Sequence, residues 1–518
     1  MTITEAIEYI NAHTWSQWKL GLSRTEELLR LLGNPQKQLR FVHVAGSNGK
    51  GSTCAMVERI LREAGYVTGF YPSPYIEDFR ERIQVCGEYI TEEALCRITA
   101  RVRDAADSME DHPSQFEIIT AIGLLYFAEK NCNIVVLEVG LGGIFDSTNV
   151  IDAPEVAVIT NIGLEHTEYL GNTLAEIAGN KCGIIKSGAD VVCYENAAEV
   201  MDVVRRVCEE KGCPLHIARY SRILLIEKGL EGQTFRFLHD PAPASQDIAI
   251  SADEPLRLGL LGEYQLHNAA TALTIVEALR GRGWKIPQEA VCQGLAEVRW
   301  PARFEVLSRH PLFILDGGHN PQCAEALAES LREYLPDCNS NMAESLREYL
   351  PDCNSDLAES LREYLPDCNS NMAESLREYL PDSNSDLTDR ESDLPGRKAD
   401  LGKKAVFLMG MLADKDYRAV IDIISPFAAG FVCLTPDSPR ALPAEKLAAE
   451  LQERGFYAKP CGTAAEGIKE ALSLAVRLGG RGCGTEDTSE KGALPVVSFG
   501  SLYMAGAVRS AFRSFAGL

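Results

Sequence analysis

A chain of 518 residues with 46% hydrophobic residues is long enough to form two or three domains with sizeable cores. Its formal net charge of −23 argues against a nucleic acid or an anionic membrane as a partner, but not against small anionic substrates. The acidic N-terminus, the absence of a long apolar run and 16 cysteines without a CxxC pair predict a cytoplasmic protein with reduced thiols.

The first half of the chain alternates helical and strand patterns. Apolar periodicity and capping residues predict helices within 1–35 and at 53–64, 91–106, 116–130, 173–185 and 197–210. Apolar runs predict buried strands at 41–45, 66–71, 133–139, 156–162 and 191–194. Strands that alternate with helices indicate an α/β domain with a mostly parallel, doubly wound sheet.

A glycine-rich turn follows the first of these strands and reads GSNGKGS over residues 46–52. Strand, glycine turn and helix form the context of a phosphate-binding loop, in which backbone N–H groups and the positive end of the helix meet an anion. Lys50 can reach terminal phosphates and the Ser52 hydroxyl can approach Mg²⁺. The common pattern is not fully matched, because Val44 takes its first glycine position and Gly51 separates the lysine from the hydroxyl.

Three further polar residues follow predicted strands and so fall at the same sheet edge. Ser73 follows residues 66–71, Glu138 closes 133–139 and His166 follows 156–162. Ligands gather at the carboxyl ends of the strands in such sheets. A buried carboxylate beside a phosphate loop points to Mg²⁺, and the alternative for Glu138 is a strand-end glutamate in solvent. Ser73 and His166, each taken alone, are typical of ordinary polar loop surface, and only their position at the same sheet edge favours a ligand role.

The second half changes pattern twice. Short alternating segments within 222–261 predict an antiparallel patch appended to the sheet, and a helix at 264–280 follows. A second α/β alternation begins near residue 300, with strands expected at 311–316, 405–410, 431–435 and 495–500. We therefore expect an ATP-binding domain over 1–299 and a smaller Rossmann-like domain over 300–518.

A tandem repeat interrupts this second domain. The segment ESLREYLPD begins at Glu329, Glu344, Glu359 and Glu374, and 329–400 holds 18 acidic against 7 basic residues. One copy would complete the helix after Asn320, and the others would form an acidic insert that ends near residue 402. We expect a neutral surface insertion, and the alternative is a binding arm for a partner.

Together these stretches resemble the folylpolyglutamate synthases of the Mur ligase superfamily. The resemblance covers almost the whole chain outside the repeats. It is carried by GSNGKGS (46–52), SQFE (114–117), LEVGLGGIFDSTN (137–149), HNAATAL (267–273), WPARFE (300–305), LDGGHNP (315–321) and FGSLYMAG (499–506).

The resemblance implies a ligase that uses ATP to join L-glutamate to the γ-carboxylate of a folate through an acyl phosphate. Dihydropteroate is a second substrate in some relatives. Two Mg²⁺ sites, with room for a monovalent cation, and a monomeric state are also implied. The chain alone leaves two alternatives open: a related ligase for a cell-wall precursor, and a nucleotide-gated binding protein that uses the acidic repeat.

The resemblance also assigns roles to residues that would otherwise read as ordinary surface or caps. The implied ATP-binding set is Asn48, Gly49, Lys50, Gly51, Ser52, Asn268, Arg303 and Asp316. The implied metal ligands are Ser52, Ser73, Glu138 and His166, and the implied folate contacts are Phe116, Glu117, Thr148 and Asn149. Lys50, His319 and Lys181, the last carbamylated by CO₂, would be catalytic.

Four positions depart from the family pattern. Tyr75 stands where histidine is usual, Ile144 replaces an arginine, and Asn180 and Cys182 flank Lys181 in place of glutamate and alanine. The change at Ile144 concerns the details of folate contacts, whereas Lys181 itself is retained.

Overall fold

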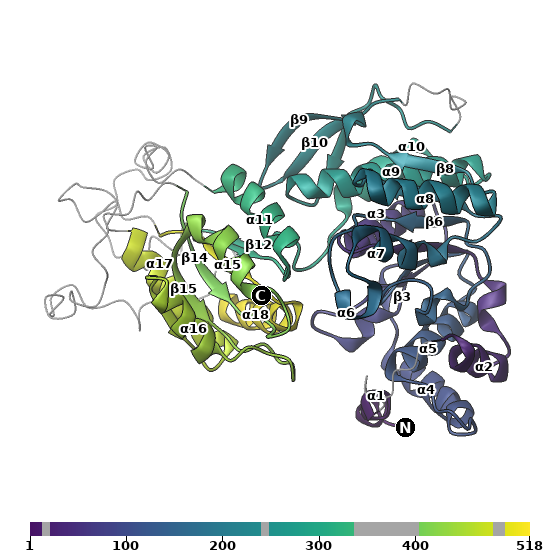
Figure 1. Cartoon of the computed structure of the whole chain (residues 1–518), viewed down its shortest axis with the longest axis horizontal. Coiled ribbons are helices and arrows are strands. Elements are labelled where there is room, and N and C mark those ends of the chain that lie inside the picture. The colour runs from purple at the N-terminus through teal and green to yellow at the C-terminus, as the bar shows by residue number, and fades with distance from the viewer. Residues whose placement is uncertain (13–20, 240–247, 336–402, 480–492, 518) are drawn as a thin grey trace, which may run out of the picture. The chain divides into compact units, whose positions relative to one another are not determined.

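The computed structural model describes residues 1–12, 21–239, 248–335, 403–479 and 493–517, and two compact units divide the chain, Met1–Trp300 and Pro301–Leu518 (Figure 1). The repeats from residue 336 onward, and therefore most of the predicted insert, lie outside the described residues. None of the helices in these ranges has the length and apolar character needed to span a bilayer.

The first unit is built on an eight-stranded sheet in the order β4-β3-β2-β5-β1-β6-β7-β8. Its strands are β1 Phe41–Ala45, β2 Thr68–Tyr71, β3 Gln84–Val85, β4 Glu88–Tyr89, β5 Ile134–Glu138, β6 Val156–Ile159, β7 Asp190–Tyr194 and β8 Leu215–Ala218. All neighbours pair in parallel except β2 with β3 and β3 with β4. The predicted mostly parallel sheet is confirmed, and the hairpin β3–β4 and strand β8 were not predicted.

Helices cover both faces of this sheet. They are α1 Ile3–Ala12, α2 Ser23–Leu31, α3 Lys50–Glu63, α4 Glu92–Ala106, α5 Gln115–Glu129, α6 Thr167–Leu170, α7 Leu174–Lys181, α8 Ala198–Lys211, α9 Glu263–Gly281 and α10 Gln288–Glu297. One core joins α3, α9 and α10 to Val42 and Val44 of β1. On the other face, Phe41 packs with α1, α2, α4 and α5, and Ala45 packs with α7 and α8.

The antiparallel patch is a separate sheet, so the prediction that it extends the large sheet was wrong. Its strands are β9 Ile223–Gly229, β10 Gly232–Phe237 and β11 Leu256–Leu258, in the order β11-β10-β9. One of the alternating segments expected as strands within 222–261, residues 248–252 (IAISA), forms no strand. Phe235 and Phe237 of β10 enter the same core as α3 and α9, so the patch packs onto the covering helices instead of pairing with a sheet edge (Figure 1).

The second unit holds a six-stranded sheet in the order β12-β13-β17-β14-β15-β16. Its strands are β12 Glu305–Arg309, β13 Leu312–Leu315, β14 Ala405–Met409, β15 Ala428–Cys433, β16 Ala458–Pro460 and β17 Val496–Phe499. Its helices include α11 Pro321–Tyr334, α15 Tyr417–Ile424, α16 Ala444–Glu453, α17 Ala464–Gly479 and α18 Leu502–Ala516. The four predicted strands are confirmed, and the first copy of the repeat completes α11 as expected.

Candidate functional site

The phosphate loop ends earlier than the sequence predicted. Helix α3 begins at Lys50 and not at Thr53, because Gly49 takes a left-handed conformation (φ 85°) at its N-cap. The first turn of a helix has N–H groups without intrahelical partners, and its dipole favours negative charge. Lys50, Gly51 and Ser52 therefore present the anion-binding end of α3 at the carboxyl end of β1.

The loop is pinned to the neighbouring strand β6. The backbone nitrogen of Ser47 donates to the carbonyl of Asn161 at 2.8 Å, and the Thr160 hydroxyl donates to the carbonyl of Asn48 at 2.8 Å. A Cβ at Gly46 would stand 1.8 Å from Thr160 Oγ1, so only glycine allows this approach. These contacts hold the anion-binding turn against the end of β6.

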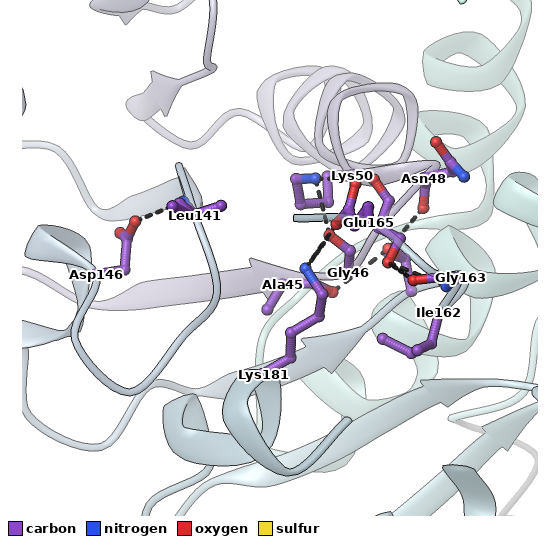
Figure 2. A network of polar contacts seen from close by, with 12 residues as sticks. Ala45, Gly46, Asn48, Lys50, Leu141, Asp146, Ile162, Gly163, Glu165 and Lys181 are labelled. Carbon is purple, nitrogen blue, oxygen red and sulfur yellow. Dashed lines mark hydrogen bonds and ion pairs between the residues drawn. The ribbon is translucent and has the colours of Figure 1, made fainter. Parts of the chain in front are cut away.

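Two lysines converge on one carbonyl oxygen of this loop, as Figure 2 shows. Lys50 Nζ donates to the carbonyls of Gly46 (2.8 Å) and Ser47 (3.1 Å), and Lys181 Nζ donates to Gly46 at 2.9 Å. Lys181 is buried and forms an ion pair with Glu165 at 2.9 Å. Two ammonium groups thus face one carboxylate, which leaves an excess of positive charge beside the loop.

Burial and charge act in opposite directions on this ion pair. Burial raises the pKa of Glu165, but the positive charges of Lys181 and Lys50 outweigh it and lower the pKa to about 2. Burial lowers the pKa of Lys181, and Glu165 offsets part of that change. The lowered pKa eases removal of the proton from the Lys181 amine.

Glu138 is buried at the end of β5, as predicted, and Oε2 of its carboxylate accepts the backbone N–H of Ser73 at 3.1 Å. This bond joins the ends of β5 and β2.

The Ser52 hydroxyl is buried and accepts a hydrogen bond from Gln265 Nε2 at 3.1 Å. His166 is exposed and begins α6 in a left-handed conformation. Among the residues that the structure describes, no group of three or more acidic, histidine or cysteine side chains could hold a metal alone.

Asn268 lies on α9 against the phosphate loop. Its Nδ2 donates to Gln265 Oε1 at 3.0 Å, and its Oδ1 would be 2.4 Å from a Cβ on Gly49. The structure therefore places Asn268 beside the phosphate loop, and Gln265 links it to Ser52. The contact of Asn268 with ATP that the resemblance implies stays a prediction.

Glu117, which the resemblance implies as a folate contact, forms its hydrogen bonds with other residues of this chain. Its carboxylate accepts hydrogen bonds from Arg24 Nε (3.3 Å), Thr25 Oγ1 (3.1 Å) and the backbone nitrogen of Ser114 (2.7 Å). With Ser114 it forms the capping box that starts α5. These contacts hold α2 against α5, and a direct contact of Glu117 with a folate stays a prediction.

The other three implied folate residues lie around the loop that follows β5. Thr148 is fully buried and bonded through its hydroxyl. Asn149 Nδ2 donates to the carbonyls of Ile144 (3.1 Å) and Gly183 (3.3 Å). Phe116 packs against Gly140, where a Cβ would meet its ring at 2.5 Å. The structure gathers this set in one region, and its contact with substrate remains a prediction.

In the second unit, the implied residues lie at the end of β13. Asp316 is buried and accepts the backbone N–H groups of Phe304 (2.9 Å) and Gly318 (2.7 Å). Arg303 donates to the carbonyl of Ala302 at 2.9 Å. A Cβ at Gly317 would stand 3.1 Å from the Arg303 guanidinium, so Asp316 and Arg303 belong to one local structure. His319 follows in the same turn.

Sequence reasoning missed Glu165, His43, Asp146 and Gln265. Glu165 precedes a residue that was singled out, His166, so its place at the sheet edge was a usable signal. His43, in the middle of a buried strand, was a polar exception that could have been noticed. Glu165, His43 and Gln265 pair with Lys181, Thr148 and Ser52, which are 16 to 213 residues away, so no local pattern reveals them. Asp146 pairs with Thr148 and Leu141 within five residues, so its local N-cap position before Ser147 was a usable signal.

A family profile and two related proteins point to the same protein family. A family profile described as Mur ligase middle domain matches residues 44–276. The folylpolyglutamate synthase of Lacticaseibacillus casei is 30% identical over 517 residues, covering 98% of both chains. The dihydrofolate synthase/folylpolyglutamate synthase of Bacillus subtilis (strain 168) is 38% identical over 341 residues, covering 63% of this chain and 76% of that protein.

Solved structures give the same result for the fold. The Mycobacterium tuberculosis folylpolyglutamate synthase, complexed with ADP and AMPPCP, aligns with a TM-score of 0.75 at 25% identity over 98% of both chains. The Escherichia coli protein FolC in complex with DHPP and ADP aligns with a TM-score of 0.71 at 25% identity, covering 99% of this chain and 98% of that one. The chain belongs to the folylpolyglutamate synthase/dihydrofolate synthase family of Mur ligases.

Proposed function

We propose that this chain is an ATP-dependent ligase that joins L-glutamate to the γ-carboxylate of a folate. The observation that carries the proposal is the phosphate loop at the end of β1, with Lys50 and Lys181 on one side and the buried carboxylate of Glu138 at the end of the next strand. Relatives with this activity in their names match up to 98% of the chain.

The reaction needs two transfers. A carboxylate oxygen of the folate attacks the γ-phosphorus of ATP, the bond to the bridging oxygen breaks, and ADP leaves. The glutamate amine then attacks the acyl carbon, the amide forms, phosphate leaves, and the amine loses a proton. Catalysis of the first transfer consists mainly of positioning and of stabilising charge on the transferred phosphoryl group.

Lys50 supplies part of that charge. Its ammonium donates to two carbonyls of its own loop, Gly46 and Ser47. Rotation of this flexible side chain toward the γ-phosphate exchanges two neutral acceptors for an anionic one, and charge-assisted hydrogen bonds are roughly twice as strong as neutral ones. The N–H groups at the start of α3 hold the remaining phosphate oxygens.

The oxygen donors at the sheet edge fit Mg²⁺. Mg²⁺ is usually held by one or two carboxylates together with substrate phosphates and water, not by a complete protein cage. We assign the carboxylate of Glu138 and the hydroxyls of Ser52 and Ser73 as the oxygen ligands of two such sites. We add the imidazole of His166, a nitrogen donor, because the family resemblance implies it. Bound there, the metal would neutralise charge on the ATP phosphates.

Lys181 suits the implied carbamylation in one respect and opposes it in another. A carbamate forms from the neutral amine, and burial of Lys181 lowers its pKa. The product is an anion next to Glu165, which now forms an ion pair with the ammonium. Carbamylation therefore needs additional positive charge at this place, which bound Mg²⁺ would supply.

Three residues of the second unit remain to be assigned roles in the reaction. We propose that Arg303 and Asp316 bind ATP and that His319 assists at the acyl phosphate or the incoming glutamate. Excluding water from the acyl phosphate is needed to prevent its hydrolysis. We also propose that the enzyme acts as a monomer in the cytoplasm.

Mass spectrometry of the products tests the proposal. The purified chain is incubated with ATP, Mg²⁺ and L-glutamate together with tetrahydrofolate, dihydropteroate or a UDP-sugar peptide in separate reactions. We expect a glutamylated folate with one ADP released per bond formed. A product from dihydropteroate would add the second activity named for relatives such as that of Bacillus subtilis. Product from the UDP-sugar peptide alone, or ADP release without any ligation product, would overturn the assignment.

A further inference from the structure

A polar side chain stands between two apolar cores beneath the phosphate loop. His43 is the middle residue of β1 and is fully buried. Side chains alternate along a strand, so His43 shares the face of Phe41 and Ala45. Phe41 belongs to the core with α5 and Ala45 to the core with α7, which places His43 at the boundary between them.

The imidazole begins a chain of hydrogen bonds that ends on the loop after β5. His43 Nε2 lies 2.8 Å from Thr148 Oγ1, and the Thr148 hydroxyl donates to Asp146 Oδ1 at 2.5 Å. Asp146 also accepts the backbone N–H groups of Thr148 (3.0 Å) and Leu141 (2.8 Å). Figure 2 shows the last of these bonds. One carboxylate thus ties the beginning of the loop to its end.

The direction of these bonds fixes the tautomer of the histidine. The Thr148 hydroxyl has one proton and donates it to Asp146, so its oxygen must accept from His43. The imidazole therefore carries its proton on Nε2, and Nδ1 is a bare acceptor. Within the described part of the chain, this buried Nδ1 has no hydrogen-bond partner.

Burial, with a smaller contribution from the nearby charge of Lys186, lowers the pKa of His43 to about 3. The ring is therefore neutral at any pH at which the enzyme works. A buried acceptor without a hydrogen-bond partner destabilises the fold. The neighbours of His43 in the strand, Val42 and Val44, are apolar. A histidine that only filled space would be replaceable by an apolar residue without this cost.

We propose that His43 is a positioning residue that fixes the loop of residues 139–150 for the folate substrate. The loop leaves Glu138, passes Gly140, which packs against Phe116, and ends at Thr148 and Asn149. A Cβ at Gly140 would stand 3.2 Å from Asp146 Oδ2, so the carboxylate of Asp146 lies next to the place where Phe116 packs on Gly140. A shift of this carboxylate would therefore disturb the packing of Phe116. The inference rests on the proposed function, because it concerns binding of that reaction's carboxylate substrate.

Two substitutions separate hydrogen bonding from packing. His43→Leu fills a similar volume but cannot donate to Thr148, whereas His43→Gln places an amide donor close to the position of Nε2. We expect His43→Leu to raise KM for the folate about tenfold, the effect of losing one buried hydrogen bond, with KM for ATP within about twofold. His43→Gln should restore most of the affinity for the folate.

Matched variants and a second readout complete the test. Thr148→Val should cause the same loss as His43→Leu, and the double variant should lose no more than either one. Thr99→Val alters a buried hydroxyl on α4 that has no hydrogen-bond partner among the described residues, and it should leave both KM values unchanged. Nitrogen-15 NMR of histidine-labelled wild-type enzyme should show the His43 ring protonated at Nε2 and bare at Nδ1.

The outcomes are distinguishable. Wild-type enzyme that makes no glutamylated folate refutes the proposed function, while the NMR measurement still decides the tautomer. Normal KM for the folate in His43→Leu, additive losses in the double variant, or a proton on Nδ1 would each overturn the role of His43. If His43→Leu does not fold, His43→Gln and the NMR spectrum of the wild type still decide between the two outcomes.

Discussion

Substituting Glu117 by glutamine tests whether this residue supports the fold or contacts the substrate. Its side chain is 4% exposed and forms an ion pair with Arg24, which is 6% exposed, at 3.1 Å. Glutamine keeps an oxygen acceptor but removes the negative charge. Breaking a buried ion pair typically costs about 3–5 kcal/mol, because the remaining charge is left buried without compensation.

The retained amide oxygen and a distant carboxylate reduce this cost. Asp111 lies 4.0 Å from the Arg24 guanidinium but is 51% exposed, so water screens its charge. We therefore expect Glu117→Gln to lower the free energy of unfolding of the first unit by about 3 kcal/mol. Loss of the capping box at Ser114 is part of this figure, since both effects involve the same carboxylate.

Urea unfolding followed by tryptophan fluorescence measures this change in the first unit alone. All four tryptophans precede Pro301, so the signal does not report on the second unit. Glu27→Gln is the matched control, because it breaks the ion pair with Arg30 at a site where both partners are largely exposed. Such pairs contribute about 0–1 kcal/mol.

If the buried ion pair stabilises the fold, Glu117→Gln must lower the free energy of unfolding more than Glu27→Gln does. Equal unfolding midpoints for Glu117→Gln and Glu27→Gln would refute a structural role for the buried pair. KM for the folate, measured on folded enzyme, gives the second criterion. If stability is unchanged and this KM rises tenfold or more, Glu117 is a substrate contact, as the family resemblance implied.

Four further predictions concern the rest of the chain. Lys50→Ala should abolish ADP release, because the γ-phosphate loses its positive partner; a near-normal rate would contradict the phosphate loop. Glu138→Gln should raise the Mg²⁺ concentration for half-maximal rate, and an unchanged Mg²⁺ titration would remove Glu138 from the metal site. Burial lowers the pKa of Lys186 from 10.5 to about 8, so between these values the unfolded chain binds more protons and the free energy of unfolding should rise with pH. That rise, at most about 1.4 kcal/mol per pH unit, should be missing in Lys186→Met when urea unfolding is measured from pH 7.5 to 10. Deletion of residues 344–388 should leave the ligation rate within about twofold of the full chain, whereas loss of activity would support a binding role for the repeats.

The parts of the fold that follow from local pattern were predictable from the sequence. Strand β1 has the predicted bounds, since five consecutive residues are buried on both faces of a parallel sheet. Helix α4 begins at Glu92, within one residue of the predicted start at 91, and the hydroxyl of its N-cap Thr91 accepts the backbone N–H of Ala94 at 3.2 Å. Local patterning and capping decide such elements without help from distant residues.

Other elements depend on contacts that no local pattern records. Helix α3 begins three residues early because Gly49, not the polar Ser52, is its N-cap. The alternating strands β9 to β11 were recognisable, but their pattern did not tell whether they pair with the large sheet or pack elsewhere. Strands β3 and β4 have two residues each, too few for any periodicity to be detected.

For the candidate site, the sequence predicted positions better than partners. Lys50 and Glu138 lie at the loop and at the strand end where they were expected. The ion pair of Lys181 with Glu165 was not foreseen, because burial and charge partners depend on the folded chain. Likewise, the substrate role implied for Glu117 rested on a motif, and the motif alone does not separate a contact from a cap.

The departure of the phosphate loop from the common pattern has a structural reason. A hydroxyl residue usually follows the lysine, yet Gly51 stands there and Ser52 comes one position later. A Cβ at Gly51 would lie 2.9 Å from Trp300 Nε1 and 3.0 Å from its Cζ2, so the indole packs directly on the first turn of α3. The Trp300 ring also contacts Phe70 of β2, with centroids 5.5 Å apart. Pro301 begins the second unit, so Trp300 is the last residue of the first unit. Gly51, the glycine that departs from the common pattern, therefore allows Trp300 to pack against the phosphate loop.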